Sequence, residues 1–171
     1  MKKAIFILFL GLFFANSYAQ VGDLFVGANG GFITKYNDGM YGLNVSYHLA
    51  DPVEVSFTGL LNPNVSLTDE FDKNIVDKLS LYSFNLDLRY YMLHMRSWGT
   101  GPVLGYQHFI VKDKNTSLGD FNTSGFNIGW NVRANLTDEI KLFGGWRYTM
   151  ASDDAKHHFF NIGIGYTFSL F

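Results

Sequence analysis

A strict alternation between large apolar and small polar residues near the C-terminal end restricts this chain more than any other feature of its sequence. Between positions 160 and 170, the even residues are large and apolar, and the odd residues are small or polar: Phe160, Ile162, Ile164, Tyr166, Phe168 and Leu170 against Asn161, Gly163, Gly165, Thr167 and Ser169. Successive side chains of a β-strand point to opposite faces. The period therefore predicts a strand with one oily face and one small, polar face.

The same alternation recurs along the chain and predicts eight strands in total. It is clear in most segments and weaker at 24–32 and 101–111, which both contain several glycines or mixed positions. The predicted strands are Leu24–Phe32, Tyr41–Leu49, Val53–Leu61, Tyr82–Met92, Gly101–Val111, Gly125–Leu136, Ile140–Met150 and Phe160–Leu170.

The links between these segments alternate in length. Three are short, at Ala50–Pro52, His94–Ser97 and Thr137–Glu139, and four are longer and polar, at Thr34–Gly39, Asn62–Lys78, Lys112–Asn122 and Ala151–Lys156. Within the longest link, the spacing of Phe71, Ile75 and Leu79 fits one or two turns of amphipathic helix, and it also fits an early start of the next strand.

This alternation of link lengths favours a membrane barrel. Bacterial outer-membrane barrels have short periplasmic turns and longer outer loops, and an even number of strands places both chain ends on the short-turn side. An open sheet edge in hydrocarbon would leave unpaired backbone groups, so the first and last strands must pair. We predict an all-β fold, an eight-stranded antiparallel up-and-down transmembrane β-barrel.

A soluble β-sandwich or a lipocalin-like barrel is the alternative, and composition argues against both. Charged residues make up 16% of the chain, below the roughly 25% usual for soluble domains. The polar strand faces consist mostly of Gly, Asn, Ser and Thr, which suit a tight lumen better than a solvated surface. Aromatic residues near the strand ends fit two interfacial girdles, Tyr47, Tyr90, Trp98, Tyr166 and Phe168 at one rim and Tyr41, Tyr82, Trp146 and Tyr148 at the other.

The N-terminal segment predicts export. Lys2 and Lys3 precede the apolar run Ala4–Phe14, which is shorter than the roughly 20 residues of a membrane-spanning helix. A small residue follows at Ala19, so we expect a signal peptide over 1–19 and a barrel domain over 20–171. Without Lys2 and Lys3, 11 of the 13 basic residues remain against 15 acidic ones. That balance disfavours nucleic-acid binding. The chain has no cysteine, so we expect no disulfide and no lipid anchor.

The stretch from Asn161 to Phe168 resembles the C-terminal assembly signal of outer-membrane proteins, which reads polar, any, Gly, any, any, aromatic, any, aromatic. The residues that carry this resemblance are Asn161, Gly163, Tyr166, Phe168 and the terminal Phe171. Together with the strand pattern, it makes the whole of 20–171 similar to the OmpX/Ail/OmpA-like family of small outer-membrane β-barrel proteins. The resemblance implies recognition by the barrel assembly machinery, contact with outer-membrane lipid, a monomer, and a role in adhesion, defence or envelope integrity.

Six charged residues fall on the predicted lumen faces. An eight-stranded barrel is only wide enough for side chains, and charges confined there must be paired and hydrogen-bonded. We therefore expect a structural ion-pair network and no substantial pore, with a solute path or gate as the alternative. The residues are Glu54, Asp87, Arg89, Arg133, Lys141 and Arg147.

The sequence does not favour catalysis. Some eight-stranded barrels modify lipid A, and a hydrolase needs Ser, His and an acid close together. Barrel-type lipid A deacylases carry His and Ser two residues apart on one strand, but Phe159 and Phe160 stand at that distance from His157 and His158. Ser46 precedes His48, which is the reverse order.

Metal and cofactor binding are not predicted either. The acidic residues of the longest link lack the glycine and the ligand spacing of a calcium loop; they are Asp69, Glu70, Asp72 and Asp77. We therefore expect a non-enzymatic surface barrel without cofactor or metal, in which Asn62–Lys78 and Lys112–Asn122 are the segments available to an extracellular ligand. A lipid A-modifying enzyme and a narrow porin-like channel are the alternatives.

Overall fold

The computed structural model describes residues 22–68, 76–95, 97–113, 120–151 and 156–169. The proposed signal peptide and Phe171 lie outside these ranges. Among the described residues, no helix is long and apolar enough to cross a membrane. The strands are β1 (Asp23–Ile33), β2 (Asp38–Ala50), β3 (Val53–Thr68), β4 (Val76–Tyr90), β5 (Leu93–His94), β6 (Trp98–Asp113), β7 (Phe121–Asn135), β8 (Ile140–Ala151) and β9 (His157–Ser169).

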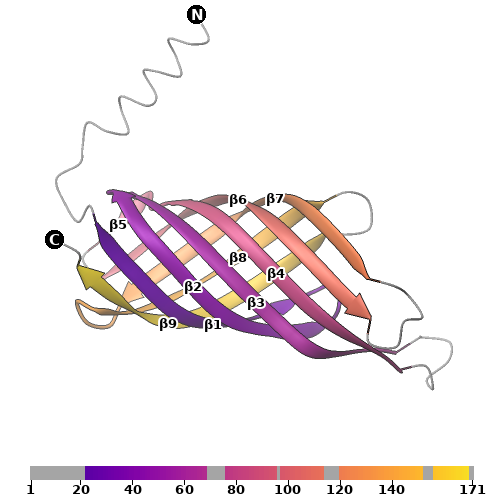
Figure 1. The fold of residues 1–171 in the computed structure, drawn as a ribbon. Helices are drawn as coiled ribbons and strands as arrows, with labels where there is room; N and C mark the ends of the chain where they lie inside the picture. Colours follow the sequence, from indigo (N-terminus) through magenta and orange to yellow (C-terminus); the bar gives the residue numbers. More distant parts are fainter. Residues whose placement is uncertain (1–21, 69–75, 96, 114–119, 152–155, 170–171) are drawn as a thin grey trace, which may run out of the picture.

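The strands close into a barrel (Figure 1). Each long strand pairs antiparallel with its neighbour, β4 pairs directly with β6, and the two-residue β5 extends alongside β6. Closure is made by β1 and β9, which pair over their whole length from Asp23 opposite Ser169 to Ile33 opposite Phe159. The eight long strands confirm the predicted eight-stranded, antiparallel, up-and-down barrel.

The apolar strand faces point outward. In β2, Tyr41, Leu43 and Val45 are exposed, whereas the intervening Asn44 and Ser46 are buried in the lumen. The other long strands follow the same rule, which leaves a continuous band of exposed large apolar side chains around the barrel. Water would solvate such a band poorly, and hydrocarbon is its natural solvent.

The two ends of the barrel differ, as Figure 1 shows. The short links after β2 and β7, together with β5, lie at the same end as the start of β1 and the end of β9. We call this end the short-turn rim. The opposite end, where β1 turns into β2 and where β3 and β6 finish, is the long-link rim.

The links predicted at Asn62–Lys78 and Lys112–Asn122 are shorter than expected. Strand β3 continues to Thr68 and β4 already begins at Val76. Leu79 belongs to β4, so the early-strand alternative is correct there and a helix at that position is wrong. Likewise β6 continues to Asp113 and β7 begins at Phe121. Phe71 and Ile75 lie outside the described residues.

A β-bulge explains why the end of β3 does not look like a strand in the sequence. The register with β4 shifts between Asn62 and Val65, which accommodates Pro63, a residue without a backbone N–H that strands tolerate only at edges and bulges. The Asn62 side-chain amide donates to the Gly39 carbonyl oxygen at 2.6 Å. The Ser80 hydroxyl donates to the Pro63 carbonyl oxygen at 3.2 Å. Beyond the bulge the alternation changes phase, and Val65 is fully buried.

Candidate functional site

The lumen contains two layers of different chemistry. Toward the short-turn rim it holds the charged layer, which comprises His48, Glu54, Asp87, Arg89, Tyr91, Arg133, Lys141 and Arg147. Toward the long-link rim it holds the apolar plug, which comprises Ile33, Met40, Leu60, Val65, Leu79, Leu81, Phe109, Val111 and Phe159. Any activity of the lumen has to work through these two layers.

Glu54 is the centre of the charged layer. Arg89 Nη1 donates to Glu54 Oε1 at 2.7 Å, and Arg133 Nη1 donates to Glu54 Oε2 at 3.2 Å. His48 Nδ1 lies 3.6 Å from Glu54 Oε2. The Tyr91 hydroxyl donates to the same oxygen at 3.5 Å, and its ring centroid lies 4.4 Å from the Arg133 guanidinium. One buried carboxylate thus balances two arginines, from β4 and from β7, which are separated by β6.

A second ion pair joins Asp87 to Arg147, with Arg147 Nη2 2.7 Å from Asp87 Oδ2. Arg147 Nη1 also donates to the Asn161 side-chain oxygen at 3.1 Å. Lys141 is buried in the same part of the lumen, but the ion pairs of the described residues do not include it. The structure therefore brings five of the six charged residues singled out from the sequence into ion pairs.

A belt of neutral polar side chains connects the two layers. The Gln107 amide donates to the Ser83 hydroxyl at 2.6 Å, and the Thr149 hydroxyl lies 2.6 Å from the Gln107 carbonyl oxygen, to which it donates. The Asn127 amide donates to the Asn85 side-chain oxygen at 3.2 Å. These side chains come from four neighbouring strands, β4, β6, β7 and β8, so the belt occupies that side of the lumen.

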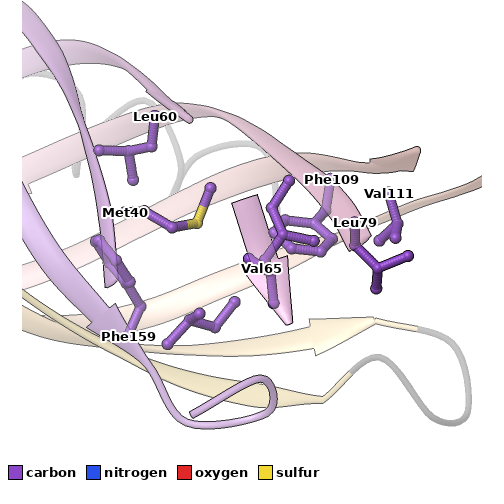
Figure 2. Close-up of a cluster of buried hydrophobic side chains, with 9 residues drawn as sticks. Met40, Leu60, Val65, Leu79, Phe109, Val111 and Phe159 are labelled. Carbon is purple, nitrogen blue, oxygen red and sulfur yellow. The ribbon is translucent and has the colours of Figure 1, made fainter. Parts of the chain in front are cut away.

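The apolar plug was not predicted. Figure 2 shows its side chains converging from several strands at the long-link end of the lumen. Tyr36, from the turn after β1, packs against the plug and stacks on Phe109 with ring centroids 5.7 Å apart. The sequence signal was present but missed: near this rim both faces of a strand become apolar, as in Leu60–Leu61 and Phe159–Phe160.

At the closing seam between β1 and β9, glycines of β9 lie directly against aromatic rings in the lumen. Phe25 and Phe143 contact each other edge to face in the lumen, with centroids 5.3 Å apart. A Cβ added at Gly165 would lie 2.4 Å from the Phe25 ring, and one added at Gly163 would lie 2.5 Å from the Phe143 ring. No side chain fits at these two positions unless the rings or the strands move.

The residues of the proposed assembly signal divide between the two faces of β9. Asn161 and Gly163 face the lumen, whereas Tyr166 and Phe168 are exposed on the outer face with ring centroids 4.8 Å apart. Phe171 lies outside the described residues. The described part of the signal is thus an ordinary, fully paired strand in the finished barrel, and its recognition during assembly stays a prediction.

The histidines do not form the arrangement considered from the sequence. His157 is buried beside Phe109, and His158 is exposed and accepts a hydrogen bond from Trp146 Nε1 at 3.1 Å. A different His–Ser pair exists: His108 Nδ1 lies 2.8 Å from the Ser124 hydroxyl, across β6 and β7. Sequence spacing could not reveal it, because the two residues stand on neighbouring strands. Among the described residues, no carboxylate is hydrogen-bonded to His108.

Comparisons with known proteins agree with this architecture. A family model described as the outer membrane protein beta-barrel domain matches residues 5–168. No curated protein sequence matches the chain. Solved structures that share the fold at low identity include three from different organisms. The N-terminal β-barrel domain of Pseudomonas aeruginosa OprF has a TM-score of 0.62 at 16% identity, and the match covers 86% of this chain and 98% of that one.

The other two are Ail, the attachment invasion locus protein of Yersinia pestis, and a major outer membrane protein from Thermus thermophilus. Ail has a TM-score of 0.57 at 12% identity, with 86% of this chain and 99% of that chain covered. The Thermus protein has a TM-score of 0.62 at 15% identity, with 86% and 100% covered. At these identities the likeness concerns the fold, whereas the family model spans nearly the whole sequence. The chain belongs to the outer membrane protein β-barrel domain family and is a β-barrel protein of the outer membrane.

Proposed function

We propose that this protein is a non-enzymatic outer-membrane barrel with a closed lumen, whose long-link rim serves as a contact surface outside the cell. The observation that carries the proposal is the two-layered lumen. A solute would have to displace both the apolar plug and the ion pairs of Glu54 and Asp87. Separating a buried ion pair leaves an uncompensated charge, which is strongly unfavourable.

The proposal predicts that the folded protein does not conduct ions. In planar lipid bilayers we expect a flat current trace after insertion of the refolded barrel, because the plug and the charged layer block the same axis in series. The insertion itself is checked on the same preparation by the shifted mobility of the unheated barrel on a denaturing gel. Stable, reproducible openings of the wild-type protein would contradict a closed lumen.

We propose that the barrel lacks hydrolase activity toward the lipids around it. The His108–Ser124 pair has the residue types of a nucleophile and a base, but a hydrolase also needs a group that orients the histidine and donors for the oxyanion. In the described part of the chain no acid contacts His108, and β6 and β7 use their backbone N–H groups in the ladder around this pair. A lipid A species that lacks an acyl chain and appears only in cells with wild-type Ser124 would contradict this proposal.

The long-link rim is proposed as the contact surface because β3 and β4 continue past the plug residues Val65 and Leu79, to Thr68 in β3 and from Val76 in β4. One structure with this fold, Ail in complex with the heparin analogue sucrose octasulfate, has a TM-score of 0.56 at 15% identity. In this chain, residues 69–78 hold four acidic residues against Lys73 and Lys78. Their charge favours a neutral or cationic partner over a polyanion. Retention of the folded protein on immobilised heparin at physiological salt would contradict that choice of partner.

A further inference from the structure

The outer face of β6 and β7 changes from apolar to polar toward the long-link rim. Four cross-strand pairs follow one another along this face: Leu104 opposite Ile128, Tyr106 opposite Phe126, His108 opposite Ser124, and Ile110 opposite Asn122. The first two pairs are apolar and exposed, and the Tyr106 and Phe126 rings meet edge to face with centroids 5.7 Å apart. The last two pairs contribute an imidazole, a hydroxyl and an amide on the same side of the barrel.

An apolar groove with a volume of about 510 Å³ lies on this outer face. Ligand sites in proteins typically have volumes of about 300–1,000 Å³, so the groove is large enough for part of a lipid. The side chains that line it on the outer face are apolar apart from the Tyr106 hydroxyl, and they include Leu86, Leu88, Leu104, Tyr106, Phe126 and Ile128. Tyr106 and Phe126 are also the direct neighbours of the His108–Ser124 pair along their strands, so the polar pair stands at the end of the groove.

The His108–Ser124 pair keeps a hydrogen-bond donor for a further partner. If the serine hydroxyl donates to Nδ1 across their 2.8 Å separation, the imidazole Nε2–H remains available. If Nδ1–H donates to the serine oxygen, the hydroxyl proton remains available. In hydrocarbon such a donor is costly unless it finds an acceptor. Both residues are only partly buried, so a lipid carbonyl or phosphate oxygen can reach them.

A cation completes the series toward the rim. Lys112 follows His108 and Ile110 on the same face of β6 and is exposed, and its ammonium lies 6.0 Å from the centroid of the Tyr82 ring. Lysine at a membrane interface is attracted to anionic headgroups. The order apolar groove, hydrogen-bonding pair and cation matches the order of parts in a phosphorylated lipid, namely acyl chain, ester or amide linkage, and phosphate.

We propose that this face binds one molecule of lipid A, the phosphorylated glycolipid of the outer leaflet. An acyl chain lies in the groove, its ester or amide linkage bonds to His108 and Ser124, and a phosphate contacts Lys112. The assignment rests on the proposed orientation, which turns the long-link rim outward. That orientation places the polar end of the groove in the outer leaflet, where lipid A and not a glycerophospholipid is the resident lipid. Amide linkages and sugar hydroxyls also offer Asn122 additional partners.

Native mass spectrometry of the refolded barrel in detergent, titrated with purified hexa-acylated lipid A, tests the proposal. We expect one lipid A to remain bound to the wild-type protein. In the variant Lys112→Gln with His108→Phe, its affinity should fall about tenfold or more, because hydrogen bonds to charged groups and a phosphate contact are lost. Ile128→Trp should weaken binding as well, because the indole fills the groove without altering the polar residues. The unheated gel shift verifies that each variant is folded.

His158→Gln is the matched control, since His158 is an exposed histidine near the same rim on the β8–β9 side. It should leave lipid A binding unchanged. If lipid A affinity fell equally in the control and in the Lys112 and His108 variant, the bound lipid would be nonspecific annular lipid. That result would overturn the site. Equal binding of phosphatidylglycerol would overturn lipid A as the occupant, and undiminished binding of dephosphorylated lipid A would overturn the Lys112 contact. None of these results depends on whether the lumen conducts, so failure of this site and failure of the proposed function are distinguishable.

Discussion

Replacement of Glu54 by Gln is expected to lower the free energy of unfolding by about 3–5 kcal/mol, the range found when one partner of a buried ion pair is removed. Glu54 is 2% exposed and balances both Arg89 and Arg133. The amide keeps the shape of the side chain but not its charge, so two guanidinium groups would face each other in the lumen. The effect should exceed that of a typical single substitution, which costs about 1 kcal/mol.

Urea-induced unfolding of the barrel in lipid vesicles, followed by tryptophan fluorescence and gel mobility, measures this loss. The matched control is Glu139→Gln, which removes an equal charge from the exposed turn between β7 and β8. There the carboxylate accepts only one exposed hydrogen bond, from Thr137 at 3.1 Å, so we expect a change within about 0.5 kcal/mol. If Glu54→Gln lowered the free energy of unfolding no more than the control does, the charged layer would not contribute to stability.

Substitution of Gly163 by Ala is expected to cost about 3 kcal/mol, at the upper end of the usual range for overpacking. The added Cβ would lie 2.5 Å from the Ala28 carbonyl oxygen and 2.5 Å from the Phe143 ring. The ring can rotate away, but the carbonyl oxygen belongs to the backbone of β1, the strand that closes the barrel. A single methyl group would therefore push the two closing strands apart.

The measurement is the fraction of barrel that refolds into lipid vesicles, read from the unheated gel, together with its unfolding midpoint. Refolding into vesicles proceeds without assembly machinery, so a defect there reports packing and not recognition of the C-terminal signal. Gly30→Ala is the matched control in the same strand pair, because the nearest atom to its added Cβ is 3.7 Å away. Phe143→Leu should restore part of the loss in Gly163→Ala. If the Gly163→Ala and Gly30→Ala variants were equally stable, the seam would accommodate an added methyl group, and the prediction would be wrong.

The barrel itself was predictable because a membrane requires a regular pattern. Strands with one face in lipid alternate over most of their length, and the alternation around Ile162 and Ile164 was visible without knowledge of any partner strand. The link lengths agreed with that number of strands and predicted that the short turns share one rim. The outward direction of the oily faces followed from the scarcity of Lys and Glu on the polar ones.

The remaining features depend on register or on the loss of alternation. Pro63 suggests a turn, but a bulge incorporates it into β3. The apolar plug departs from the polar lumen because both faces of its strands are apolar near the long-link rim. Contacts such as that of Glu54 with Arg133, which are 79 positions apart, or His108 with Ser124 need the strand register. A single sequence does not contain that register explicitly.

The charged layer also has a consequence for how the strands find their partners. Its ion pairs link β3 to β4 and β7, and β4 to β8, so they can all form only when β3, β4, β6, β7 and β8 stand side by side in the correct register. A slip of one position between two strands would turn every side chain of one of them to the opposite face. Arg89 or Arg133 would then face hydrocarbon, at a cost of about 2–4 kcal/mol for an arginine near the bilayer midplane. The buried charges therefore favour the correct register. The free energy of a misaligned barrel rises with the number of charges that it turns toward the hydrocarbon.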